Sequence, residues 1–161
     1  MSPRAAWQLE AMRFSDVYDF VDGKIEWISH GLPVEGAGPH FAVAGEVADR
    51  GAVLACRIGD RLGEVAHKLD TVRHDYCVVL NDRDIVLGRM RKQNLQGPDG
   101  TKVEHVMEPG PTTVRASEPA QGLLERMSKK KVPAVIVTTN KGRLMGTVTQ
   151  EALERLISSR P

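Results

Sequence analysis

The chain has 161 residues, of which 41% are hydrophobic, 27% charged and only 4% aromatic. This length fits one compact domain or two small units with a shared core, and it excludes a large multidomain enzyme. A formal net charge of +1 provides no overall electrostatic field, so neither a nucleic acid nor a membrane is expected as a partner.

Residues 1–43 are predicted to form an N-terminal arm and linker. Residues 4–13 have weak helical character, residues 17–30 suggest a second short helix, and residues 31–39 are rich in glycine and proline. Because a terminal segment stays ordered only when something holds it, Tyr18 and Trp27 are expected to pack on the rest of the chain or on a second copy.

Residues 44–107 are predicted to form a first β-α-β-β unit. An apolar start at 53–55 leads past a polar break into Leu62, Val65, Ala66 and Leu69, which have helical spacing. Two apolar runs at 77–80 and 85–87, separated by a polar turn, then indicate a hairpin.

Residues 108–161 repeat this order, which is the strongest architectural signal in the sequence. Ser117 is expected to cap a helix whose first turn holds Glu118 and Pro119. The remaining elements are a strand at 112–114, a helical stripe at 123–127, strands at 135–137 and 144–148, and a final helix at 150–157.

Neither unit could bury enough apolar surface alone, so we expect the two to pack sheet to sheet. The predicted fold is a mixed α/β (α+β) tandem of β-α-β-β-α modules with a helical N-terminal arm. The boundary falls near residue 108, and Gly88 and Gly146 occupy equivalent points.

Residues 44–158, and above all the segments 106–114 and 142–146, resemble a pair of cystathionine-β-synthase (CBS) domains. The resemblance implies a non-enzymatic regulatory or sensor protein that forms a homodimer through its helices and acts on an unidentified regulated protein. It also implies a cleft ligand that contains adenosine, with AMP, ATP and S-adenosylmethionine as candidates, and no required cofactor.

Both copies depart from the ribose-binding pattern of that family, in which a glycine is followed by a hydroxyl residue and then by an aspartate. In the second copy Thr149 supplies the hydroxyl, but Ala152 stands where the carboxylate belongs. In the first copy Arg91 replaces the hydroxyl, whereas Asn94 could still bond a ribose.

The resemblance therefore assigns the ligand contacts to Arg89, Arg91, Asn94, Thr113, Pro133, Ala134 and Thr149. Two alternatives stay open. The cations near Gly88 could be solvated surface charges, or the clefts could bind nothing and the chain could act only as an interaction module.

Residues 17–36 also resemble the closing segment of a rhodanese domain, and residues 56–61 have the Cys-x4-Arg spacing of its active-site loop. A rhodanese nucleophile precedes that segment, but no cysteine precedes Cys56. A sulfurtransferase remnant is accordingly the least favoured hypothesis.

The remaining polar residues point to structural roles. Cys56 and Cys77 are expected to be buried thiols in strands, with a redox role left open, and the absence of a signal peptide favours a cytoplasmic location. The histidines have no metal-ligand spacing, so no metal site is expected. Residues 129–131 are lysines that suit the C-terminus of a helix.

Overall fold

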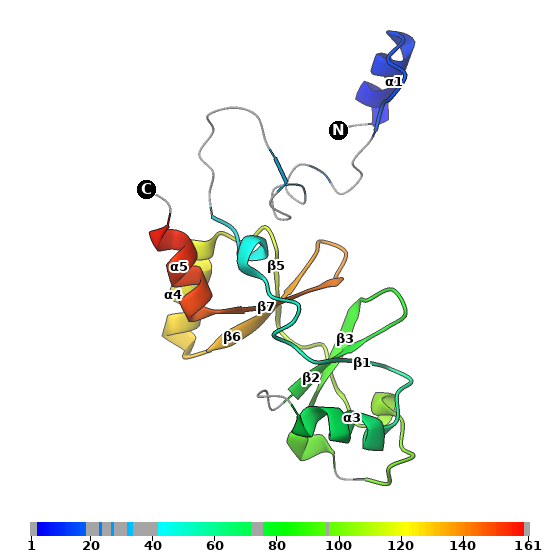
Figure 1. Ribbon diagram of the computed structural model, residues 1–161, viewed down its shortest axis with the longest axis vertical. Coiled ribbons are helices and arrows are strands. Elements are labelled where there is room, and N and C mark those ends of the chain that lie inside the picture. Colours follow the sequence, from blue (N-terminus) through cyan, green and yellow to red (C-terminus); the bar gives the residue numbers. More distant parts are fainter. Residues whose placement is uncertain are drawn as a thin grey trace.

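The computed structural model describes residues 3–18, 23, 27, 32–33, 42–71, 76–95 and 97–159. The first helix, α1, covers Pro3–Ala11 and lies apart from both sheets (Figure 1). Tyr18 is 81% exposed, so its side chain does not pack on the rest of a single chain, and its packing on a second copy stays a prediction. Most of the predicted helix at 17–30 lies outside the described residues.

The first module contains a four-stranded sheet in the order β1-β2-β3-β4. Its elements are β1 (Ala55–Arg57), α3 (Leu62–Asp70), β2 (Tyr76–Leu80), β3 (Val86–Arg91), the 3-10 turns η2 (Lys92–Asn94) and η3 (Val103–His105), and β4 (Glu108–Pro109). The β1 strand is parallel to β2, and the other pairs are antiparallel. In the described residues, the three-residue turn η2 directly follows β3, where an α-helix was expected.

The second module contains a three-stranded sheet in the order β5-β6-β7. Its elements are β5 (Thr113–Arg115), α4 (Ala120–Lys130), β6 (Ala134–Thr138), β7 (Leu144–Thr149) and α5 (Gln150–Ser158). The N-cap of α4 is Pro119, so the predicted cap at Ser117 is wrong. Ser117 lies in the turn that precedes the helix.

The two modules repeat with a constant offset of 58 residues. Strands β1, β2 and β3 begin at Ala55, Tyr76 and Val86, and their counterparts begin at Thr113, Ala134 and Leu144. Even the irregularities repeat, because both hairpins shift register just after the residue that pairs with the glycine. The predicted equivalence of Gly88 and Gly146 is confirmed.

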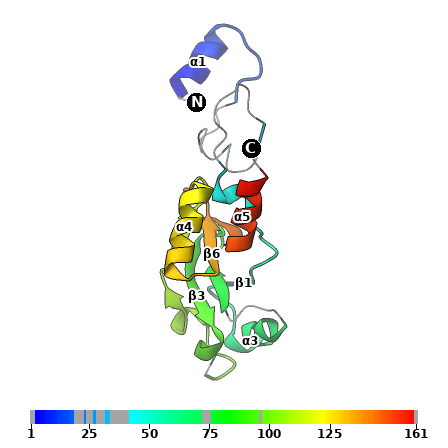
Figure 2. The ribbon, with the colours of Figure 1, turned by 90° about the vertical axis from the view of Figure 1, so that its left-hand side faces the viewer.

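Apolar residues gather in three clusters. One lies between α3 and the first sheet, and a second lies beneath α4 and α5, which stand together against one side of the molecule (Figure 2). The third joins the two sheets and contains Val78, Leu80, Ile136 and Leu144. The predicted sheet-to-sheet packing is therefore confirmed.

The segment that precedes each module pairs through its backbone with the other module. Asp49 and Thr147 exchange backbone hydrogen bonds of 3.0 and 3.1 Å, and Glu108 pairs with Arg89. These approaches require glycine, because a Cβ on Gly146 would lie 2.4 Å from the Asp49 carbonyl carbon and one on Gly88 would lie 2.8 Å from the Met107 sulfur. The turn η1 (Ala44–Val47) likewise contacts α5 and β7 of the second module.

Candidate functional site

The most complete candidate site is a cavity of about 630 Å³, which we call the β5–α4 cavity. Such a volume lies in the range of small-molecule sites. Strands β5 and β6 and helix α4 of the second module form most of its wall, and Tyr76 and Arg89 close it from the first module. Apolar contacts are available from Leu123, Met127 and Val135.

Among the described residues that line this cavity, cations outnumber carboxylates. The cations are Arg89, Arg115, Arg126 and Lys130, and the carboxylate is Glu118. Two of the positive charges are balanced by ion pairs of 2.7 Å, from Arg126 to Glu118 and from Arg89 to Glu108.

The other two cations, Arg115 and Lys130, have no ion pair with a carboxylate in the part of the chain that the structure describes. Arg115 donates a 3.2 Å hydrogen bond to the Asn140 side-chain oxygen, and a neutral amide does not balance a guanidinium charge. Lys130 ends α4 beside the cavity. An anionic group in the cavity would therefore meet favourable electrostatics.

Tyr76 gives the first-module wall a polar tip. Burial raises the pKa of the Tyr76 phenol, and the positive charge of Arg89 opposes this effect. The phenol is consequently protonated at neutral pH and can donate a hydrogen bond. Together, the lining offers an apolar wall, hydroxyl groups and cations.

A second, more open cavity of about 660 Å³ lies beside α5, and we call it the α5 cavity. The residues that line it include Asp49, Ala52, Thr149, Ala152 and Arg155. The Thr149 hydroxyl already accepts a 3.2 Å hydrogen bond from the Ala152 backbone N–H. The charged residues that line the α5 cavity are Asp49 and Arg155, which have opposite signs. This cavity therefore does not favour anions as the β5–α4 cavity does.

The structure distributes the predicted contacts over both cavities. Arg89, Thr113 and Ala134 line the β5–α4 cavity, and Thr149 lines the α5 cavity.

The other three predicted contacts are placed differently. Arg91 lies 3.4 Å from the Glu108 carboxylate and is absent from both linings. Pro133, also absent from them, accepts a hydrogen bond from the Gln150 N–H through its carbonyl. The side chain of Asn94 lies outside the described residues.

Sequence reasoning missed Tyr76, Arg115, Arg126 and Lys130. The signal for Arg126 and Lys130 was available, because they follow Leu123 and Met127 by three residues on α4 and so lie beside the apolar stripe. Lys129 and Lys130 do end α4, with Lys131 as its C-cap, as predicted.

The structure offers no support for chemistry at Cys56. Its thiol is buried in β1 against Cys77 rather than in a loop of free amides. The rhodanese-like segment at 17–36 lies largely outside the described residues. In the described part of the chain, no three histidine, cysteine or acidic side chains come together as metal ligands.

A family model described as the CBS domain matches residues 103–159. No match appears among curated proteins. Within the ranges that the structure describes, no helix has the length and apolar character needed to cross a membrane.

Solved CBS-pair structures resemble this chain in fold. The CBS pair domain of a putative Mg2+ transporter from Shewanella oneidensis MR-1 has a TM-score of 0.64 at 14% identity, over 98% of this chain and 85% of that one. The CBS pair of protein MJ0100, in complex with 5-methylthioadenosine and S-adenosyl-L-methionine, has a TM-score of 0.54 at 17% identity, over 75% and 99%.

The cytosolic domain of the Mg2+ channel MgtE in complex with ATP has a TM-score of 0.60 at 21% identity, over 72% of this chain and 50% of that one. The present chain thus spans about half the length of that domain. At these identities the likeness shows the fold alone, which is the fold of a tandem CBS pair.

Proposed function

We propose that this chain is a non-enzymatic sensor that binds an adenosine-containing or other anionic metabolite in the β5–α4 cavity. The observation that carries the proposal is the positive charge of Arg115 and Lys130, which no carboxylate of the described residues pairs with, in a cavity with an apolar wall. Phosphate or carboxylate would pair with the cations, and a base would pack on Leu123, Met127 and Val135.

Related folds support an adenosine ligand. The MJ0100 pair holds 5-methylthioadenosine and S-adenosyl-L-methionine, and the MgtE domain holds ATP. Because both modules contribute to the wall, a ligand would couple Tyr76 and Arg89 of one sheet to α4 of the other. Such coupling is the physical basis for passing a binding state to a regulated protein.

Thermal unfolding with and without AMP, ATP and S-adenosylmethionine at millimolar concentration tests the proposal. A ligand at 100 times its Kd stabilises the folded state by about 2.7 kcal/mol, so one of them should raise Tm clearly. In Lys130→Ala the Kd should rise about tenfold, for a lost charge worth about 1.4 kcal/mol.

Lys129→Ala provides the matched control, because it removes the same charge from the neighbouring position of α4 without touching the cavity lining. Its Kd should equal that of the unmodified chain. Failure of every ligand to raise Tm, or equal losses in both variants, would reject the β5–α4 cavity as the binding site.

The α5 cavity allows a test by gain of function. Ala152 occupies the position of the ribose carboxylate in the CBS pattern, within the first turn of α5. Ala152→Asp should create a stabilising response to AMP that survives Lys130→Ala, because the new carboxylate can accept ribose hydroxyl hydrogen bonds. Ala152→Leu, which adds bulk without an acceptor, should show no such response.

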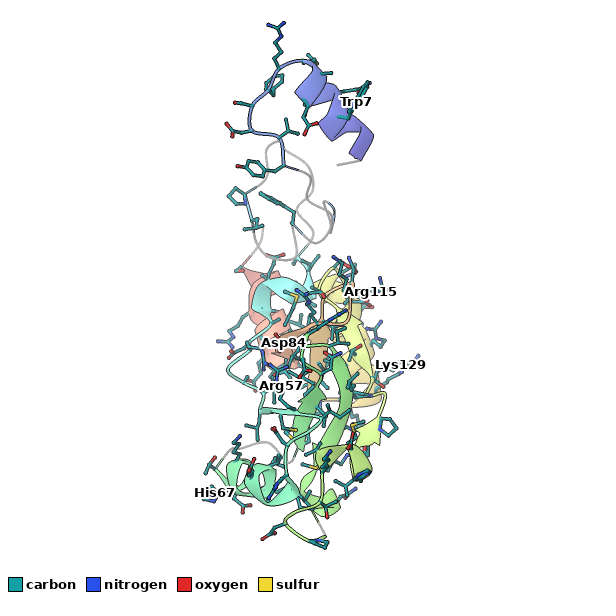
Figure 3. The ribbon with its side chains drawn as sticks, turned by 90° about the vertical axis from the view of Figure 1, so that its right-hand side faces the viewer. Trp7, Arg57, His67, Asp84, Arg115 and Lys129 are labelled. Atoms are coloured by element: carbon teal, nitrogen blue, oxygen red, sulfur yellow. The ribbon has the colours of Figure 1, made fainter. Side chains whose placement is uncertain are left out.

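The second candidate is a ligand-free interaction module. It is favoured by the ion pairs that already satisfy Arg89 and Arg126 and by large apolar side chains exposed in the arm, such as Trp7 at 66%, which projects from α1 (Figure 3). Absence of any ligand response, combined with self-association or partner capture that is lost when residues 3–18 are removed, would favour this second function.

We also propose that the chain forms a homodimer through α4 and α5, which pack side by side. Light scattering coupled to size-exclusion chromatography measures the mass directly. A monomer mass at all concentrations tested would reject the dimer.

A further inference from the structure

The buried thiols of the first module face each other. The sulfur atoms of Cys56 and Cys77 lie 3.3 Å apart, and both cysteines are free. They come from the adjacent parallel strands β1 and β2, in which Cys56 pairs with Val79. A disulfide requires a sulfur separation of about 2.05 Å, so a closure of about 1.2 Å would join them.

The hydrogen bond between the two thiols shifts their pKa values in opposite directions. It lowers the pKa of Cys77, against the effect of burial. The same hydrogen bond, followed by burial, raises the pKa of Cys56. Either thiol can donate this hydrogen bond, and the lowered pKa favours Cys77 as the thiolate that reacts first.

Access to the pair runs through β1. This strand has three residues, lies at the edge of its sheet and pairs with one neighbour, β2. Short edge elements open at a lower free-energy cost than the whole domain. Both thiols share a buried cluster with Leu62, Val65 and Leu69 of α3, so β1 and the α3 helix that follows it would have to open together to uncover them, while β2 stays paired with β3.

We propose that Cys56 and Cys77 form a reversible intramolecular disulfide, with hydrogen peroxide as the oxidant and a small thiol as the reductant that restores both cysteines. The Cys77 thiolate attacks one peroxide oxygen, the O–O bond breaks, and hydroxide takes up a proton and leaves as water. Cys56 loses its proton and attacks the resulting sulfenic sulfur, the S–O bond breaks, and a second water leaves. Two electrons pass from the sulfurs to the peroxide.

The disulfide would act on the β5–α4 cavity through Tyr76, an inference that rests on the proposed function. Tyr76 precedes Cys77 on β2 and lines the cavity, whereas Cys77 faces the core under α3. Drawing β2 toward β1 would displace the tyrosine from the cavity wall. Ligand affinity should then depend on the oxidation state.

Mass spectrometry of the full chain tests the disulfide. The protein is treated with hydrogen peroxide, quenched with catalase, unfolded with N-ethylmaleimide present and weighed intact. The reduced chain should carry two maleimide adducts. The oxidised chain should carry no adduct and weigh about 2 Da less than the unlabelled reduced chain, because two hydrogens are lost. Reduction with dithiothreitol before labelling should restore both adducts. A digest should contain the peptides of Cys56 and Cys77 joined.

Two retained adducts, an intermolecular disulfide, or separate oxygen additions on each cysteine would overturn the proposal. The disulfide is tested on the wild-type chain, so the test holds even if the control variants Cys56→Ser and Cys77→Ser fail to fold. Ligand titration of both forms tests the link to the cavity. Equal affinities would overturn the link alone, and absence of binding to the reduced form would count against the proposed function while the disulfide stands.

Discussion

The two modules share one strand register but differ beyond their last long strand. After β7 the chain enters the nine-residue helix α5, whose N-cap Thr149 accepts a hydrogen bond from the Ala152 N–H. After β3 it makes only the three-residue turn η2, whose N-cap Arg91 makes no such bond. Thr149 and Arg91 are equivalent positions of the repeat.

The difference teaches that strand pairing and helix formation are specified by separate residues. Pairing depends on the apolar strands and on Gly88 and Gly146, which both copies retain. A helix also needs a cap and an apolar stripe. The second copy has these in Thr149 and Leu153, whereas Gly97 and Pro98 interrupt the first copy soon after Asn94.

The largest expected effect distinguishes the two glycines. Gly146→Ala should lower the free energy of unfolding by about 3 kcal/mol, because its Cβ would press on the Asp49 backbone. Gly88→Ala should cost about 1 to 2 kcal/mol, because the flexible Met107 side chain can move away from part of the contact, although the Glu108 carbonyl cannot. Urea unfolding measures both.

Gly122→Ala is the control for these substitutions. A Cβ at this position of α4 meets nothing within 4 Å, and alanine favours a helix, so stability should rise by about 0.5 kcal/mol. If Gly88→Ala proved as costly as Gly146→Ala, the neighbours of Gly88 would be as rigid as the Asp49 backbone beside Gly146. The predicted difference between the two glycines would then be wrong.

An intermediate effect is expected at the two caps. Thr149→Ala removes the side-chain acceptor of α5 and should cost about 1 kcal/mol. Arg91→Ala removes no cap and only an exposed ion pair, so its cost should stay below about 0.5 kcal/mol. Chemical denaturation followed by circular dichroism compares them, and equal costs would show that the Thr149 cap contributes nothing.

A smaller loss of stability than at Thr149 is expected at the arginines that end β1 and β5. Arg57 pairs with Asp84 at 2.7 Å and with the Asn81 carbonyl, but both charged side chains are about half exposed. Figure 3 labels the two residues close to each other. Arg57→Ala should therefore cost less than about 1 kcal/mol.

Its counterpart Arg115→Ala should cost still less, because Arg115 bonds a neutral amide. It should, however, weaken anion binding in the β5–α4 cavity, which Arg57 does not line. Thermal unfolding with and without ligand separates the two properties. A weaker ligand response in Arg57→Ala than in Arg115→Ala would contradict this assignment.

The repeat and the sheet packing could be predicted because periodic apolar residues and the two glycines encode them locally. The missing helix after β3 could not, since the family pattern predicts a helix in both copies alike. The cap of α4 was placed two residues early because Ser117 is a good capping residue by type, yet it falls in the turn before Pro119.

The candidate site was predicted only in part because a cavity depends on how distant elements meet. Arg89 and Thr113 followed from motif positions. Tyr76 and Arg115 reach the same cavity only once the sheets face each other, and nothing in their local sequence shows that arrangement. Lys130 was assigned to the helix dipole alone, although its side chain also lines the cavity.

The backbone pairing between the two modules affects how the chain folds during its synthesis. When residues 44–49 leave the ribosome, their partners on β7 and α5 lie about a hundred residues downstream and do not yet exist. The first sheet likewise waits for Glu108 and Pro109. We therefore expect the native core to close only after translation of β7 and α5, so that a nascent chain halted before them presents apolar surface for chaperones to shield.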